Sequence, residues 1–221
     1  LDDNTLILFS SDHGPAPYAG NILKATPAQI HQLEEKGHFP SGPYRGYKFS
    51  IYEGGLRIPL IASWPGVVPE GATCNSLVGL CDLMATFAEM HDVTLPRAAG
   101  PDSFSFLAAL KGKKPRKKTP TRETFVMKSG SGGLMTIRSG DWKFIEGKGS
   151  GGFSGRVRGG DPLAAGGSKK RAATNDDEPP AQLYMMSEDI GETTNLYTRN
   201  PEVVSQLREQ LAEIVNSDRS R

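Results

Sequence analysis

The sequence predicts an α/β fold, in which an α/β portion is followed by a small α+β subdomain with an antiparallel sheet. Three observations indicate this class. Residues 5–9 form an apolar run typical of a buried strand, residues 76–91 repeat apolar side chains at helical spacing, and residues 123–146 contain three short strand patterns. A chain of 221 residues is long enough for one large domain or two small ones.

The first expected element is a strand over residues 5–9, Thr-Leu-Ile-Leu-Phe. A continuous apolar run fits a parallel-sheet strand that is covered on both faces. Asp12, His13 and Gly14 follow its C-terminal end, the edge at which open α/β sheets bind ligands. One parallel strand needs partners at its edges, and the chain starts at Leu1 without a methionine. We therefore expect further sequence upstream.

The middle of the chain predicts helices and one more strand. Thr26, Pro27 and Gln29 form a helix start, and Gly37 ends that helix. After a loop rich in Gly and Pro, residues 57–64 are expected as a strand in which Pro59 marks a start or an edge. Residues 76–91 give the clearest helix and residues 103–111 a shorter one.

The C-terminal part alternates short strands, turns and one helix. Ser139-Gly140-Asp141 is a hairpin signal, and Asn200-Pro201 starts an amphipathic helix. Residues 147–182 hold few large apolar side chains and are expected to form a flexible loop. The predicted strands cover residues 123–128, 134–138, 142–146 and 183–185. We therefore divide the chain into an α/β portion, residues 1–100, and an α+β subdomain, residues 101–221.

Composition and charge exclude several classes. Gly and Pro make up about 19% of the chain against an average of roughly 12%, which indicates long loops. Lys and Arg number 26 against 25 Asp and Glu, a balance that does not suit a nucleic-acid partner. No apolar window is long enough to span a membrane, and two cysteines do not make a disulfide framework.

The pair Asp12-His13 is the first candidate for chemistry. A carboxylate and a neutral imidazole at the end of a strand supply an oxygen and a nitrogen ligand for a metal ion. The alternative is a surface turn in which Asp12 bonds a backbone N–H and Gly14 adopts a positive φ. From two residues alone the turn is favoured, since metal sites need at least three ligands.

The loop before the second strand is the other candidate. Lys48 carries a mobile point charge suited to an oxyanion, and Arg45 can form a fork onto an anionic group. His38 lies close enough in sequence to this loop to contact the same substrate. The alternative for each residue is a solvated loop position.

Together these segments resemble the sulfatase family, of the arylsulfatase type within the alkaline-phosphatase-like superfamily. The resemblance rests on Asp12-His13-Gly14, on Lys48-x-x-x-Tyr-Glu-Gly-Gly-x-Arg-x-Pro59, on Trp64-Pro-Gly66, and on Gln182-Leu-Tyr followed by Asp189-x-Gly-Glu-x-x-Asn-Leu196. It spans nearly the whole chain in order. It implies that the chain is the C-terminal portion of a sulfuric ester hydrolase.

The resemblance also implies a mechanism and residue roles. The family uses a formylglycine nucleophile, made in a C/S-x-P-x-R motif, and a divalent metal, usually Ca²⁺. Asp12 and His13 would be metal ligands, Lys48 a catalytic contact to the ester oxygens, and Arg45 and His38 substrate-binding residues. Fixed cations suit this reaction because negative charge accumulates on the sulfate oxygens. The family implies a periplasmic or secreted location.

No C/S-x-P-x-R motif occurs in these residues, so the nucleophile and the other metal carboxylates are expected upstream of Leu1. We therefore expect the isolated chain to hydrolyse no sulfate ester. Many family members carry Asn at the position of His13, and since Ca²⁺ prefers oxygen ligands, metal identity is left open.

Two rival functions stay open. A phosphatase or phosphonate hydrolase of the same superfamily shares the Asp-His-Gly turn, although the Lys48 motif argues against it. A non-catalytic module that binds a sulfated polysaccharide is the other, since six basic residues fall within residues 111–118. That module would depend on Lys113, Lys114, Lys117 and Lys118, for which a solvated loop is the favoured interpretation.

Overall fold

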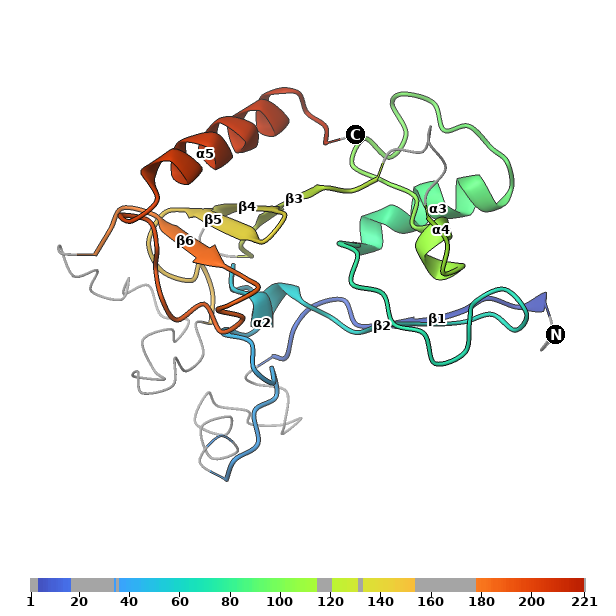
Figure 1. Ribbon diagram of the computed structural model, residues 1–221, viewed down its shortest axis with the longest axis horizontal. Coiled ribbons are helices and arrows are strands. Elements are labelled where there is room, and N and C mark those ends of the chain that lie inside the picture. Colours follow the sequence, from blue (N-terminus) through green and yellow to red (C-terminus); the bar gives the residue numbers. More distant parts are fainter. Residues whose placement is uncertain are drawn as a thin grey trace. The chain divides into compact units, whose positions relative to one another are not determined.

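The structure is a computed structural model that describes residues 4–16, 34, 36–114, 121–130, 133–153 and 178–220 (Figure 1). The chain forms two compact units, each built from segments that are distant in sequence. The first comprises Leu1–Ser10, Pro59–Phe125 and Ala212–Arg221, and the second comprises Ser11–Ile58 and Val126–Leu211. The division of the chain at residue 100 stays a prediction.

In the first unit, β1 (Ile7–Ser10) pairs with β2 (Leu60–Ser63) in an antiparallel two-stranded sheet, with Ile7 opposite Ser63. Both strands were expected. Within the described residues β1 pairs with β2 alone, and the burial of β1 by parallel neighbours from outside this chain stays a prediction. Ile7 and Phe9 are 61% and 62% exposed. An apolar run predicts a strand because its side chains favour burial, yet it does not specify which segments lie beside it.

The helix expected from residue 76 begins later. A 3-10 turn, η2 (Leu80–Asp82), leads into α3 (Leu83–Met90), and α4 (Leu107–Leu110) follows. The carboxylate of Asp82, the last residue of η2, accepts hydrogen bonds from the backbone N–H of Gly79 and of Phe104, each at 2.9 Å. The bond to Gly79 therefore stabilises the start of η2, the turn that leads into α3.

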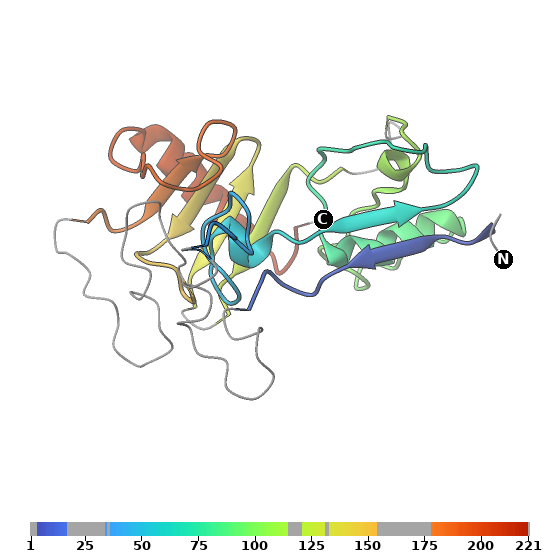
Figure 2. The same ribbon diagram turned by 90° about the horizontal axis from the view of Figure 1, so that it is seen from below.

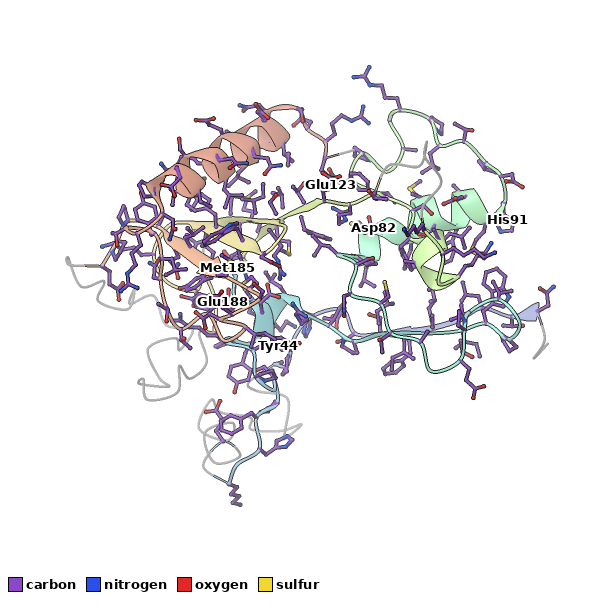
Figure 3. All side chains as sticks on the ribbon, in the orientation of Figure 1. Tyr44, Asp82, His91, Glu123, Met185 and Glu188 are labelled. Carbon is purple, nitrogen blue, oxygen red and sulfur yellow. The ribbon has the colours of Figure 1, made fainter. Side chains whose placement is uncertain are left out.

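Asp82, labelled in Figure 3, also forms the main buried ion pair of this unit. Its carboxylate lies 2.5 Å from the guanidinium of Arg122, and both side chains are almost wholly buried. The guanidinium lies 4.7 Å from the ring centroid of Phe104 and 4.2 Å from that of Phe125. Arg122 therefore forms an ion pair with Asp82 and cation–π contacts with the rings of Phe104 and Phe125.

The second unit is built on an antiparallel sheet. Its strand order is β3-β4-β5-β6. The helix α5 (Pro201–Asn216) lies along this sheet with its residues up to Leu211 (Figure 2). The guanidinium of Arg208 lies 5.4 Å from the ring centroid of Phe144. Val204, Leu207 and Leu211 form the buried face of α5, as the amphipathic pattern predicts. The strands are β3 (Thr124–Lys128), β4 (Met135–Ser139), β5 (Trp142–Glu146) and β6 (Gln182–Met185). All four predicted strands are present.

The core of this unit joins the sheet to the loop that precedes Pro59. A buried apolar cluster is formed by Ile51, Tyr52, Ile145, Tyr184 and Met186. Its first two members directly precede the short helix α2 (Glu53–Leu56). The edge-to-face rings of Tyr52 and Tyr184, 6.4 Å apart, tie the loop to β6. The segment that carries the candidate Lys48 is therefore anchored on the sheet.

Three expectations concern residues outside the described ranges: most of the helix in residues 26–37, residues 154–177 of the loop 147–182, and Lys117 and Lys118. Among the described residues, no helix has the length and apolar character needed to cross a membrane.

Candidate functional site

The turn after β1 holds the two predicted metal ligands side by side. Nδ1 of His13 lies 2.7 Å from the carbonyl oxygen of Gly14, which can only accept, so Nδ1 is the protonated nitrogen. In the neutral imidazole the lone pair is then on Nε2, and this nitrogen lies 3.2 Å from Oδ2 of Asp12. The hydroxyl of Ser11 donates to the carbonyl of His13 at 2.8 Å and closes the turn. A metal-binding histidine is oriented in this way, with its other nitrogen donating to a carbonyl.

This turn packs against the glycine pair of α2. The N–H of Gly14 donates to the carbonyl of Gly55 at 3.2 Å, and a Cβ on Gly14 would overlap the carbonyl oxygen of Gly54. Gly54 is equally confined, because its own Cβ would overlap the carbonyl oxygen of Gly46. Glycine is required at both positions because two backbones meet here.

Lys48 belongs to the same assembly. Its backbone N–H donates to the carbonyl of Pro15 at 2.9 Å, two residues after His13. Its Nζ lies 5.1 Å from the ring centroid of Phe49. The fold therefore brings the backbone of the predicted catalytic lysine next to the turn that carries Asp12 and His13, across more than thirty residues of sequence.

Arg45 and His38 occupy different surroundings. The guanidinium of Arg45 lies 3.9 Å above the ring of Tyr52 and donates to the carbonyl of Glu192 at 2.9 Å. These contacts make it a brace between the loop and the segment after β6, and its contact with substrate stays a prediction. His38 is exposed in the loop before Lys48, and its role also stays a prediction.

Behind α2 lies a buried ionic cluster that the sequence analysis did not find. Lys143 of β5 is wholly buried, and its Nζ lies 2.9 Å from Oε1 of Glu53 and 2.8 Å from Oε1 of Glu192. The backbone N–H of Glu53 donates to Oε2 of Glu192 at 2.7 Å. Buried charges of this kind persist only when paired and hydrogen-bonded. The cluster ties α2 to the sheet.

Two arginines complete the cluster on Glu53. Arg57, four residues after Glu53, lies 2.9 Å from its Oε2, and Arg138 lies 3.6 Å from the same oxygen. Arg57 also lies over the ring of Tyr44, at 4.7 Å from the centroid, and Tyr44 is labelled in Figure 3. The residue directly before the glycine pair is thus held by three cations.

The cluster moves the pKa values of its two carboxyl groups in opposite directions. Burial raises the pKa of Glu53, but the charges of Lys143 and Arg57 outweigh it and lower the pKa from 4.5 to about 2. For Glu192, burial dominates and raises the pKa above 4.5, although Lys143 acts against it. Glu53 therefore stays charged across the usual pH range.

The sequence carried a partial signal for this cluster. Lys143 stands between apolar residues in the strand pattern Trp-Lys-Phe-Ile-Glu, and alternation places it on the face opposite Trp142 and Phe144. A lysine at such a position ordinarily faces solvent. Only the tertiary structure shows that two glutamates from distant segments meet it there.

The later motif, residues 182–196, also has a structural explanation. Asp189 accepts from the backbone N–H of Thr193 and of Thr194, each at 2.8 Å, which shapes the turn that carries Glu192. Oδ1 of Asn195 accepts from the N–H of Leu183 at 3.0 Å and so fixes this turn to β6. The motif therefore places the carboxylate of Glu192 beside the ammonium group of Lys143.

The residues present fit part of a metal site. Ligands that bind one ion at about 2.0–2.5 Å lie roughly 3 Å apart, which matches the spacing of His13 Nε2 and Asp12 Oδ2, 3.2 Å. In the described residues no group of three His, Cys, Asp or Glu side chains could hold a metal ion. Asp12 and His13 can thus supply two donors, and a complete shell needs others.

Comparison with known proteins decides the family. The model of the sulfatase family matches residues 1–93, the stretch that contains the turn, the Lys48 loop and β2. A curated N-acetylgalactosamine-6-O-sulfatase of Bacteroides thetaiotaomicron is 34% identical over 97% of this chain and 37% of its own length. The chain belongs to the sulfatase family.

Solved structures agree with this assignment. A structure from work on glycosaminoglycan metabolism by Bacteroides thetaiotaomicron superposes with a TM-score of 0.72 at 33% identity, over 96% of this chain and 39% of that one. A sulfatase from Pseudoalteromonas gives a TM-score of 0.64 over 97% of this chain and 37% of its own, and at 21% identity it shows the fold alone. The expected α/β fold of this family is confirmed.

This sulfatase chain spans well under half the length of the relatives it matches.

Proposed function

We propose that the protein carrying this chain is a sulfatase that hydrolyses a sulfate ester of a glycan, with Asp12 and His13 as two ligands of a divalent metal and Lys48 as a contact to the ester oxygens. The observation that carries the proposal is the hydrogen bond from Lys48 N–H to the carbonyl of Pro15, 2.9 Å, which joins the lysine loop to the Asp12-His13 turn. A fixed cation beside a metal stabilises the charge that develops on sulfate oxygens.

The family supplies the remaining parts of the proposal. A formylglycine nucleophile and further carboxylate ligands come from outside these residues, and the metal, which we take to be Ca²⁺, polarises the ester when bound. Within this chain, the Nδ1–H bond to Gly14 keeps the lone pair of His13 on Nε2. The isolated chain is expected to be inactive, and a periplasmic or secreted location is part of the same proposal.

A glycan ester is proposed as the substrate class because a relative with 34% identity is named an N-acetylgalactosamine-6-O-sulfatase. The test is release of inorganic sulfate from N-acetylgalactosamine-6-sulfate by the whole protein, beside release of phosphate from the matching phosphate ester. Lys48→Ala should lower kcat/KM by about 10²–10³, whereas the exposed Lys36→Ala should not change it. Faster turnover of the phosphate ester would favour the phosphatase alternative instead.

Metal dependence is tested in the same protein. Chelation should abolish sulfate release and added Ca²⁺ should restore it, while Asp12→Ala and His13→Ala should each weaken the Ca²⁺ concentration dependence. Undiminished activity of both variants at low Ca²⁺ would show that the ligands lie elsewhere.

A further inference from the structure

Phe49, directly after Lys48, combines an exposed ring with an unfavourable backbone. Its side chain is 41% exposed, and its φ is 70°. A bulky residue rarely adopts a positive φ, because Cβ then crowds the backbone. Such strain persists only where the surroundings impose it, and it concentrates at binding sites.

Two glycine segments impose this conformation. The N–H of Gly130 donates to the carbonyl of Phe49 at 3.0 Å, and a Cβ on Gly130 would lie 2.5 Å from Cδ1 of that ring. A Cβ on Gly152 would overlap the backbone of Phe49. The two glycines thus form a close-fitting support for one residue.

The neighbouring segment brings a second ring. Tyr47 N–H donates to the carbonyl of Phe153 at 2.9 Å, and Ile51 N–H donates to that of Ser150 at 2.7 Å. The ring of Phe153 lies 6.1 Å from that of Phe49 with an interplanar angle of 32°. The residue that follows Lys48 therefore carries one of two tilted rings, and Phe153 carries the other.

We propose that Phe49 and Phe153 form an aromatic platform that stacks on the sugar ring of the substrate and selects glycan esters over small alkyl sulfates. This rests on the proposed function, because Lys48 must hold the sulfate. The Nζ of Lys48 lies 5.1 Å from the Phe49 centroid. An ester oxygen about 2.8 Å from that nitrogen is within about 8 Å of the ring, a span that a pyranose bridges.

The chemistry of the platform fits a pyranose. The axial C–H groups of one face of a sugar are apolar, and an aromatic ring gains free energy when such a face excludes water from it. In the part of the chain that the structure describes, the Phe49 ring is 41% exposed beside Lys48, and the proposal assigns that exposed surface to the sugar ring.

The experiment measures sulfate release by the whole protein from N-acetylgalactosamine-6-sulfate and from methyl sulfate, which has no ring to stack. Phe49→Leu and Phe49→Gly should lower kcat/KM for the sugar ester about tenfold, mostly through KM, which corresponds to about 1.4 kcal/mol. Turnover of methyl sulfate should not change. Phe49→Tyr, which keeps the ring, should restore the wild-type value.

Phe39→Leu is the matched control, because Phe39 is 42% exposed and lies in the same unit. Phe49→Gly separates binding from folding, since glycine adopts a φ of 70° without strain. Unchanged kcat/KM for the sugar ester, or an equal loss on methyl sulfate, would overturn the platform while leaving the sulfatase proposal intact. Absence of sulfate release by the wild-type protein would instead overturn the proposed function and the platform with it.

Discussion

The ammonium group of Lys143 lies 2.9 Å from the carboxylate of Glu53, and the lysine side chain is wholly buried. Glu53 directly precedes the glycine pair that contacts Gly14. One buried ion pair therefore links the antiparallel sheet to the backbone on which the Asp12-His13 turn rests. The cluster is therefore a structural support of the candidate site.

Lys143→Met should destabilise the protein strongly. The change leaves Glu53 and Glu192 buried close together without the cation between them, and breaking a buried pair in this way costs about 3–5 kcal/mol. Urea unfolding of the protein carrying this chain measures the loss. Lys113→Met, at an exposed position, is the control and should stay within about 0.5 kcal/mol of wild type.

Glu53 should make stability depend on acid pH. Its pKa falls from 4.5 to about 2 on folding, so its contribution is complete above pH 4.5 and is lost as the pH falls through 2. The shift corresponds to about 3 kcal/mol. Unfolding free energies between pH 2 and 7 should decline less steeply for Glu53→Gln than for wild type over this window. Parallel curves for the two proteins would contradict the assignment.

Gly14→Ala should disrupt the candidate site. A Cβ at this position overlaps the carbonyl oxygen of Gly54, so the turn must move away from α2. We expect a loss of about 1–3 kcal/mol in unfolding free energy together with loss of Ca²⁺-dependent activity. In Gly191→Ala the new methyl group would meet its nearest neighbour at 3.4 Å, and that variant should keep both properties.

Arg122→Met tests the first unit by itself. The variant keeps apolar contact with Phe104 and Phe125 but leaves Asp82 buried without its cation. The expected cost is about 3–5 kcal/mol in unfolding free energy, whereas the exposed Arg97→Met should cost almost nothing. A thermal shift of equal size for both variants would show that the ion pair is not the source of the stability.

The strands of the second unit could be predicted because their signals are local. Residues 142–146 alternate and follow a Ser-Gly-Asp turn, and the observed β5 has the predicted bounds. The burial of β1 was not predictable in the same way, because it depends on which segments lie beside the strand. The start of α3 was missed because the apolar repeat begins before the 3-10 turn η2, and its spacing does not show where the α-helix starts.

The sequence by itself determined the family and the residue types of the candidate site. Motifs such as Asp12-His13-Gly14 and Lys48-x-x-x-Tyr-Glu-Gly-Gly are short contiguous segments, so they can be recognised without knowledge of the fold. Tertiary structure alone decided that Lys48 is hydrogen-bonded beside Pro15, that Gly130 and Gly152 support Phe49, and that Lys143 meets two glutamates. Such contacts join residues separated by long stretches of chain, and their free energy depends on burial and charge pairing that exist only in the folded state.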